Sequence, residues 1–240
     1  MFEVCGGLEP TCTDQSCAVL GPPLAPVAGT LFAIDSTEVT QAEYAGFLAS
    51  NPTTQDLLGV PMYCITNSTY APFDDANWAA SEPSRPVVGV DWCDALAFCD
   101  WTGKSLCGAT SGGNNPVDSS DDPTKSRWFR ACVGPDNLAF PYGSSYNPDA
   151  CNGASNNLSS TIPVASLATC EGGTPGVFDM SGNVREWENS CEPLSAPGSR
   201  CLVRGGGFSD VESALQCTSA VSVPRNTHAD DIGFRCCSRP

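Results

Sequence analysis

The sequence predicts an irregular α+β protein with two main helices, short strands and many loops, cross-linked by disulfides. Its 240 residues are 41% apolar, enough for a core, and Gly 23 and Pro 20 indicate frequent turns. Fifteen cysteines are spread along the chain instead of being gathered in paired CxxC motifs, which favours disulfides over zinc modules. Two segments also carry the residues that begin helices. Together these observations indicate one large, loop-rich domain.

The N-terminal part of the chain differs from the rest. Residues 1–28 contain cysteines among glycines and prolines, so we predict a separate cysteine-containing segment or linker there. The packed domain is predicted to span residues 29–240 and to open with a strand over residues 30–34.

Two helices have physical start signals. Thr40 with Glu43, and Asp91 with Asp94, can form capping boxes, in which each side chain bonds the backbone amide of the other residue. After each start, apolar residues recur at helical spacing, and this spacing predicts the side that faces the core. The predicted core-facing residues are Tyr44, Phe47 and Leu48 in the first helix, and Trp92, Ala95, Leu96 and Cys99 in the second.

Beyond these helices the sequence predicts short elements. Residues 126–132 are compatible with one short helix. Runs interrupted by glycine predict strands and tight turns over residues 176–187, 201–208 and 232–236.

The sequence limits the possible partners of some cysteines. Cys93 and Cys99 would lie roughly 240° apart around a helix, so we expect them to pair with separate loops. Cys191 and Cys201 are near neighbours that could bridge a hairpin loop. Because fifteen is an odd number, at least one thiol stays free or pairs outside the chain.

Two adjacent cysteines near the end of the chain need different partners. Cys236 and Cys237 would point to opposite sides of a strand. We expect one of them to pair with Cys217.

The composition excludes some classes of function. Lys+Arg 11 against Asp+Glu 27 give a net charge of −16, and phosphate binding needs a concentrated positive face, so nucleic acid is not an expected partner. No run of about 18 apolar residues occurs, so no membrane-spanning segment is predicted. Disulfides indicate an extracytoplasmic protein that is secreted, periplasmic or surface-anchored. Residues 1–3 lack the features of an export signal, and we expect that such a signal has been removed.

One loop carries two carboxylates around a glycine turn. Asp179 and Glu186 flank Gly182, and calcium takes six to eight oxygen ligands in proteins. A curled loop could add the carbonyl oxygens of Gly182 and Val184. The same spacing also fits a turn with two solvated acids, so the spacing leaves both interpretations open.

Six segments of the chain carry short motifs in a fixed order: residues 38–44, 86–99, 103–106, 176–187, 203–206 and 232–236. In this order they resemble the motifs of the formylglycine-generating enzyme, or sulfatase-modifying factor, domain family. The resemblance covers about residues 29–238 and implies a compact, irregular α+β fold related to C-type-lectin-like domains.

The resemblance implies a calcium cofactor. The ligands would be the side chains of Asp179 and Glu186 with the carbonyls of Gly182 and Val184. A second site of the family would begin at Asn152 and Gly153, but this chain has no aspartate between residues 157 and 163 to complete it.

The resemblance argues against the family's oxidase chemistry. Those oxidases bind copper(I) through two cysteines, four and nine places after the Gly-Gly of the Arg-Gly-Gly motif; here these positions, counted from Gly206, are Asp210 and Leu215. No copper and no catalytic residue are therefore predicted. Cys217 would need a shift in register to substitute, so we expect it in a disulfide. His228 is the single histidine and cannot make a two-histidine iron site; we expect an exposed loop imidazole.

The favoured function is a secreted or surface-exposed binding module that is stabilised by calcium and performs no catalysis. In this fold the segment over residues 208–231 would face a protein, peptide or glycan ligand. The alternative is a copper- or iron-dependent oxidase with non-standard ligands. Arg204 and Arg235 are expected to be structural, beside carboxylates such as Asp35 or Glu186. The candidate ligand contacts are Phe208, Ser209, Asp210, Leu215, Arg225, Asn226 and His228.

Overall fold

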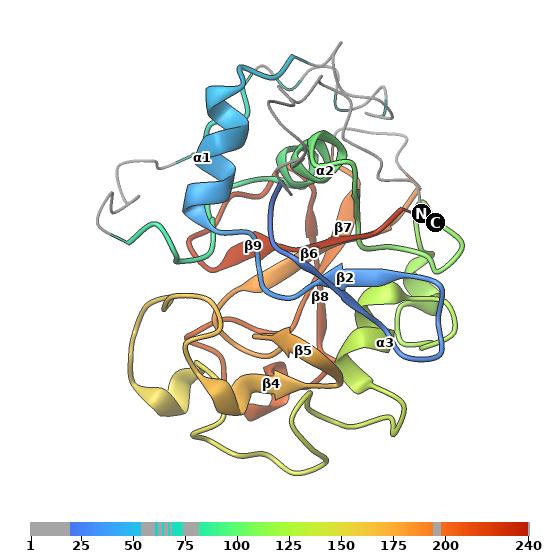
Figure 1. The fold of residues 1–240 in the computed structure, drawn as a ribbon, viewed down its shortest axis with the longest axis vertical. Coiled ribbons are helices and arrows are strands. Elements are labelled where there is room, and N and C mark those ends of the chain that lie inside the picture. The colour runs from blue at the N-terminus through green and yellow to red at the C-terminus, as the bar shows by residue number, and fades with distance from the viewer. Residues whose placement is uncertain are drawn as a thin grey trace, which may run out of the picture.

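The computed structural model of the chain describes residues 20–53, 61, 64, 67, 69–73, 82–193 and 198–239. These parts form a loop-rich α+β fold in which α1 and α2 lie at one end and β4 and β5 at the other (Figure 1). The α-helices are α1 (Gln41–Ala49), α2 (Trp92–Trp101) and α3 (Arg127–Val133). Short 3-10 turns cover Val117–Ser119, Ala154–Asn156, Ala168–Cys170 and Glu212–Ala214.

Three sheets connect the described parts. One has the strand order β1-β2-β10-β3, another the order β8-β7-β6-β9, and β4 pairs with β5 alone. Within the second sheet, β6 pairs antiparallel with β7 and parallel with β9. The strands are β1 (Leu24–Pro26), β2 (Ala33–Asp35), β3 (Ser105–Leu106), β4 (Glu171–Gly172), β5 (Thr174–Phe178), β6 (Arg185–Cys191), β7 (Arg200–Arg204), β8 (Ala220–Pro224), β9 (Ile232–Phe234) and β10 (Cys236–Cys237).

Both predicted capping boxes are present. Thr40 accepts from the amide of Glu43 at the start of α1, and Asp91 accepts from the amide of Asp94 at the start of α2. The third helix also forms as predicted, with Ser126 as its cap accepting from the amide of Phe129 at 3.1 Å. The local sequence therefore determines where each helix begins.

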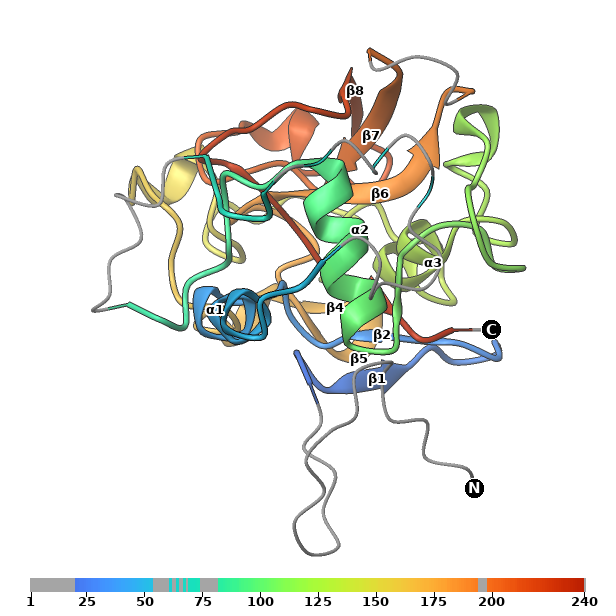
Figure 2. The ribbon, with the colours of Figure 1, turned by 90° about the horizontal axis from the view of Figure 1, so that it is seen from above.

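The core lies around α2, which contacts α1, β3 and β6 (Figure 2). Tyr44 of α1 stacks on Phe98 of α2 with 5.6 Å between ring centroids, and Phe98 meets Phe234 of β9 at 5.4 Å. Tyr44 and Phe47 are buried as predicted, whereas Leu48 and Leu96 are only partly buried. This aromatic core holds α2 against β9, the strand that follows the candidate ligand segment, residues 208–231.

The position of the first strands differs from the prediction. The strand expected over residues 30–34 is β2, Ala33–Asp35, and it pairs with β1 at Leu24–Pro26, before Gly29. Residues between these strands form a turn, in which Gly29 has φ +74° and the amide of Val27 donates to the carbonyl of Phe32 at 3.2 Å. Leu31 consequently lies exposed at the tip of a hairpin. Residues 1–19 of the predicted N-terminal segment lie outside the described residues.

The disulfides confirm three predictions and overturn one. Cys93 and Cys99 pair with separate partners, Cys191 and Cys201 bridge a hairpin, and Cys236 and Cys237 have different partners. Cys217 pairs with neither terminal cysteine, because it faces the inner side of α3, where Cys132 lies. The six bridges of the described parts are Cys64–Cys93, Cys99–Cys236, Cys107–Cys237, Cys132–Cys217, Cys151–Cys170 and Cys191–Cys201.

Candidate functional site

The candidate ligand segment, residues 208–231, follows a glycine turn at the end of β7. Gly206 has φ +70°, and a Cβ there would lie 2.6 Å from the carbonyl oxygen of Ala214. A side chain at this position would therefore push the segment away from the sheet. From the turn the chain forms a 3-10 turn and β8 before it returns to β9.

Asp210, one of the two positions compared with a copper-binding cysteine, is held by an ion pair. Its Oδ1 accepts from Nη2 of Arg185 at 2.7 Å, and its Oδ2 accepts from the amide of Gly207 at 2.8 Å. Nη1 of the same arginine donates to Asp231 at the far end of the segment. Burial raises the pKa of Asp231, and the charge of Arg185 opposes that rise. Arg185 thus fastens both ends of the segment to the start of β6.

Leu215, at the other compared position, belongs to the interior. It is 2% exposed, and its carbonyl accepts from the hydroxyl of Ser181 at 2.7 Å. Cys217 is equally unavailable, because it forms a disulfide with Cys132. The three positions therefore offer one carboxylate bound to arginine, one aliphatic side chain and one oxidised sulfur.

The predicted ligand contacts divide by exposure. Ser209, Asn226 and His228 are exposed, and Phe208 and Asp210 are partly exposed. Leu215 and Arg225 are buried, so a ligand on the surface of the segment would not reach their side chains. Nη1 of Arg225 lies 3.3 Å from Sγ of Cys93, beside the Cys64–Cys93 bridge.

The predicted calcium loop has the curled backbone that the sequence suggested. Asp179 and Gly182 both have positive φ, +59° and +77°. A Cβ on Gly182 would lie 2.3 Å from the carbonyl oxygen of Asn152, which explains the glycine. Among the described residues no donor bonds the carbonyl oxygens of Gly182 and Val184, although both residues are buried. Buried carbonyls without a donor fit ligands of a hard cation.

The carboxylates around this loop are buried together. Glu38, Asp179 and Glu186 are at most 2% exposed. Oε2 of Glu38 has no hydrogen-bond partner among the described residues. Burial raises the pKa of Asp179 to about 6, while the amide of Ala165 and the charge of Arg235 lower it. Burial, and next the charge of Asp179, raises the pKa of Glu38 well above its usual value. An added cation would offset this concentration of negative charge.

Glu186 already has strong partners in this arrangement. Arg235 donates to both of its carboxylate oxygens, at 2.7 and 2.8 Å, and Nε1 of Trp128 donates to Oε2 at 2.8 Å. A cation bound through Glu186 would share these oxygens with the arginine. The orphaned oxygen of Glu38 and the free carbonyls fit the ion more directly.

The positions of the suggested second site are linked to the same loop. Nδ2 of Asn152 donates to Oδ1 of Asn183 at 3.2 Å, and its carbonyl accepts from the amide of Asn183 at 2.8 Å. Gly153 lies against Leu215, since a Cβ there would be 2.6 Å from Cδ1 of Leu215. Asn152 and Gly153 therefore connect the calcium loop with the candidate ligand segment.

Arg204 and Arg235 are structural, as predicted. Nε of Arg204 donates to Oε2 of Glu188 at 2.8 Å, and its Nη2 donates to Asp121 at 2.6 Å. Besides Glu186, Arg235 bonds the main-chain carbonyl of Asp35 at 3.1 Å. Arg235 thus links β2 and β6, which belong to different sheets, whereas Arg204 links β7 to β6 within one sheet and to the loop that contains Asp121.

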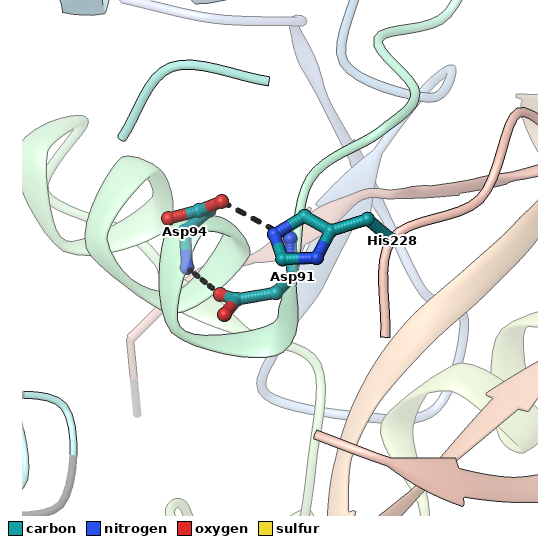
Figure 3. Close-up of side chains that lie close together, drawn as sticks. All are labelled: Asp91, Asp94 and His228. Atoms are coloured by element: carbon teal, nitrogen blue, oxygen red, sulfur yellow. Dashed lines mark hydrogen bonds between the residues drawn. The ribbon is translucent and has the colours of Figure 1, made fainter. Parts of the chain in front are cut away.

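One cluster was not predicted from the sequence. Asp91, Asp94 and His228 each place a ligand atom within 4.8 Å of the others, at the first turn of α2 (Figure 3). The two aspartates were predicted as helix caps and the histidine as a loop residue. The only sign of this cluster in the sequence was the pair of nearby aspartates. Their contact with a histidine in a distant loop could not be predicted, because no spacing rule relates the two segments.

The aspartates of this cluster are held in place. The amide of Asp91 donates to Oδ2 of Asp94 at 3.1 Å, and the amide of Asp94 donates to Oδ1 of Asp91 at 2.9 Å. Nδ2 of Asn67 donates to Oδ1 of Asp94 at 2.6 Å. Burial and then the charge of Asp91 raise the pKa of Asp94 to about 8, whereas Asn67 and the amide of Asp91 lower it.

A pocket of about 490 Å³ opens next to this cluster, between the end of α1 and residues 67–71. Asn67, which bonds Asp94, is part of its wall, as is Tyr70. Within the described parts of the chain, the hydroxyl of Tyr70 is buried without a hydrogen-bond partner.

Comparisons with known proteins agree with the fold and with the motifs. The bovine (Bos taurus) formylglycine-generating enzyme is 25% identical over 203 residues, covering 70% of this chain and 50% of the enzyme. The inactive C-alpha-formylglycine-generating enzyme 2 of Bos taurus is 27% identical over 169 residues, covering 64% of this chain and 50% of that protein. The chain thus spans about half the length of these curated relatives.

A solved structure and a family model extend the comparison to almost the whole chain. Treponema denticola variable protein 1 superposes with a TM-score of 0.56 at 20% identity, covering 93% of this chain and 94% of that one, and so shares the fold. The model of the sulfatase-modifying factor enzyme 1-like domain matches residues 5–240. With its ordered motifs and this fold, the chain belongs to the sulfatase-modifying factor enzyme 1-like domain family.

Proposed function

We propose that this chain is an extracytoplasmic, non-catalytic binding module that presents residues 208–231 to a ligand and is stabilised by calcium. One observation carries the proposal. At the two positions compared with the copper-binding cysteines of the oxidases, Asp210 is ion-paired with Arg185 and Leu215 is buried. Neither side chain can supply the soft thiolate that copper(I) prefers.

The curated relatives include one precedent for loss of activity. A protein named as inactive is 27% identical to this chain, so the family contains members without formylglycine-generating activity. The proposal extends that property to this chain on the basis of Asp210 and Leu215.

The outer surface of the segment suggests the chemistry of a ligand. Val211 is 62% exposed and Val221 is 45% exposed, and their neighbours in the sequence are mostly small polar or acidic residues. Apolar residues with polar neighbours are typical of interaction sites. The net charge of −16 favours cationic or hydroxyl-rich ligands, such as basic peptides or glycans.

Calcium would act as a structural ion. It would neutralise the buried carboxylates of the loop and bind the free carbonyls of Gly182 and Val184. Since Asn183 of this loop accepts an amide hydrogen bond from Phe208, the ion would also steady the start of the ligand segment.

The disulfides support an extracytoplasmic location. Six bridges occur in the described parts, and bridges persist in oxidising compartments. None of the described helices has the length and apolar character needed to cross a bilayer.

A binding screen tests the proposal. The chain would be applied to immobilised glycans and peptides at physiological calcium, followed by the Val211→Ser variant on every hit. We expect binding that Val211→Ser weakens, while Leu31→Ser, an exposed apolar position outside the segment, leaves it unchanged. Absence of any hit above background, or equal loss in both variants, would contradict the proposed role of the segment.

The oxidase alternative has a separate readout. Copper and iron content would be measured alongside calcium, and a cysteine-containing peptide would be assayed for conversion to an aldehyde. Calcium without a redox metal agrees with the proposal. A stoichiometric redox metal together with aldehyde formation would establish the oxidase instead.

A further inference from the structure

We infer that Asp91, Asp94 and His228 form a binding site for one divalent transition-metal ion, of which Zn²⁺ is the representative probe. The site is separate from the predicted calcium loop, and it does not depend on the proposed binding function. It joins the first turn of α2 to the end of the candidate ligand segment.

The geometry brings together three potential ligands, two carboxylates and one imidazole. Each residue contributes an oxygen or a ring nitrogen, and these atoms lie within 4.8 Å of one another. Figure 3 shows the imidazole of His228 beside the two carboxylates. A metal ion with ligand bonds of about 2.0–2.2 Å needs its donors at most about 4.4 Å apart, so a small movement of exposed His228 would close the site.

The donor set selects the class of ion. Imidazole suits zinc, copper, iron and nickel, whereas sites for calcium and magnesium are built from oxygen alone. Three protein ligands leave room for water at the remaining positions. Two carboxylates with a neutral imidazole would balance a doubly charged ion.

The surroundings hold the donors in position. Asn67 fixes the buried carboxylate of Asp94 by its hydrogen bond at 2.6 Å. The ring of Phe73 lies 5.4 Å from that of exposed His228. Such neighbouring groups orient metal ligands and strengthen binding.

A second observation near the cluster is a buried hydroxyl group, that of Tyr70, whose hydrogen-bonding capacity is unused within the described part of the chain. Tyr70 is 7% exposed, and its hydroxyl has no hydrogen-bond partner among the residues that the structure describes. The charges of Asp94 and Asp91 both act on this hydroxyl, and Tyr70 shares the wall of the adjacent pocket with Asn67. A hydrated ion held by the aspartates would supply water to this buried polar group.

The consequence is a second attachment for the ligand segment. Arg185 already holds the segment through Asp210 and Asp231. A metal ion on His228 would attach the same stretch to α2 and stiffen it.

The test is zinc titration of the full chain with its disulfides intact, calcium present and no affinity tag that contains histidine. Isothermal titration calorimetry should detect one tight zinc ion per chain. Since losing even an outer partner weakens metal sites about 10- to 100-fold, His228→Gln and Asp91→Asn should each weaken binding at least about tenfold. Asparagine caps helices about as well as aspartate, so Asp91→Asn should leave α2 intact, as circular dichroism would verify.

The matched control is Asp230→Asn, because Asp230 is an exposed acid of the same loop that lies outside the cluster. Its affinity should stay within about twofold of wild type, as expected for a surface acid that is not a ligand. NMR gives a second readout, since zinc should shift the ring signals of the single imidazole. The proposal is overturned if wild type binds no zinc, if His228→Gln binds equally well, or if the imidazole signals do not move.

Discussion

Arg235 illustrates how single buried charges hold this fold together. Its guanidinium is fully buried and bonds both oxygens of Glu186, which also accepts from the indole of Trp128. Arg235 follows β9, Glu186 belongs to β6 and Trp128 belongs to α3, so this network links three parts of the core. Removing it would leave a buried carboxylate without its counter-charge.

Arg235→Met should destabilise the chain by about 3–5 kcal/mol, the usual cost of removing one member of a buried ion pair. Denaturant unfolding without reductant would measure the change. Arg239→Met is the control, since Arg239 pairs with Asp100 at a solvent-accessible position. If both variants lost the same free energy of unfolding, burial of the Arg235–Glu186 ion pair would make no extra contribution to stability.

Glu188 predicts a pH effect. Its carboxylate is buried beside Arg204 and Ser126, and burial raises its pKa above 4.5 although Arg204 and Ser126 lower it. The folded chain then holds this proton more tightly than the unfolded chain, so stability should fall as pH rises from about 4.5 through the folded pKa. Unfolding free energies measured across this range should fall less steeply for Glu188→Gln. Parallel curves for variant and wild type would exclude this assignment.

At the level of elements, both long helices begin with reciprocal caps. Loss of the Thr40 cap leaves the first amides of α1 without a partner, so Thr40→Ala should cost about 1 kcal/mol. Thr218→Ala, at an exposed threonine that does not cap a helix, should change stability far less. Thermal or denaturant unfolding would measure the stability of both variants. If Thr40→Ala left the free energy of unfolding unchanged, tertiary packing alone would hold α1.

Arg185 holds the candidate ligand segment, residues 208–231, in place through its two ion pairs. Arg185→Met releases Asp210 and Asp231 together, so amide hydrogen exchange should accelerate over residues 208–231. The core strand β6 should stay protected beyond its first residues. Arg200→Met, which removes an exposed contact to Ser222 of β8, should not accelerate exchange along the whole segment. If Arg200→Met accelerated exchange along the whole segment, or if Arg185→Met left exchange unchanged, packing and not the ion pairs would hold the segment in place.

The sequence predicted local features well and long-range partners poorly. The caps at Thr40 and Asp91 depend on residues three apart, so their chemistry is visible in the sequence. The partner of Cys217 depends on how α3 packs, and it was predicted wrongly. The cluster at His228 was missed for the same reason, because the loop reaches α2 only through the tertiary fold. The calcium loop stays a prediction that its free carbonyls support.

At the scale of the whole molecule, two bridges close nearly the same large loop. Cys99–Cys236 and Cys107–Cys237 have sequence separations of 137 and 130. Cys236 and Cys237 are adjacent in the chain, and Cys99 lies close to Cys107 in the sequence. While one bridge is intact, the other closes only the short path through residues 99–107 and 236–237. Stabilisation by a disulfide increases with the length of the loop that it closes, so the two bridges cannot contribute independently.

Removing these two bridges one after the other should therefore lower the free energy of unfolding by a different amount at each step. Replacing Cys99 and Cys236 by alanine should cost about 3 kcal/mol, because the remaining bridge leaves a short loop. Removing Cys107–Cys237 as well should cost about 4 kcal/mol more, since a long loop then opens, shortened only by Cys132–Cys217. Denaturant unfolding of the single-bridge and double-bridge variants would measure both steps, with the Cys191–Cys201 pair, separation 10, as the isolated short-loop control. Equal and additive costs would mean that local packing around each bridge, and not the entropy of the shared loop, determines their contribution.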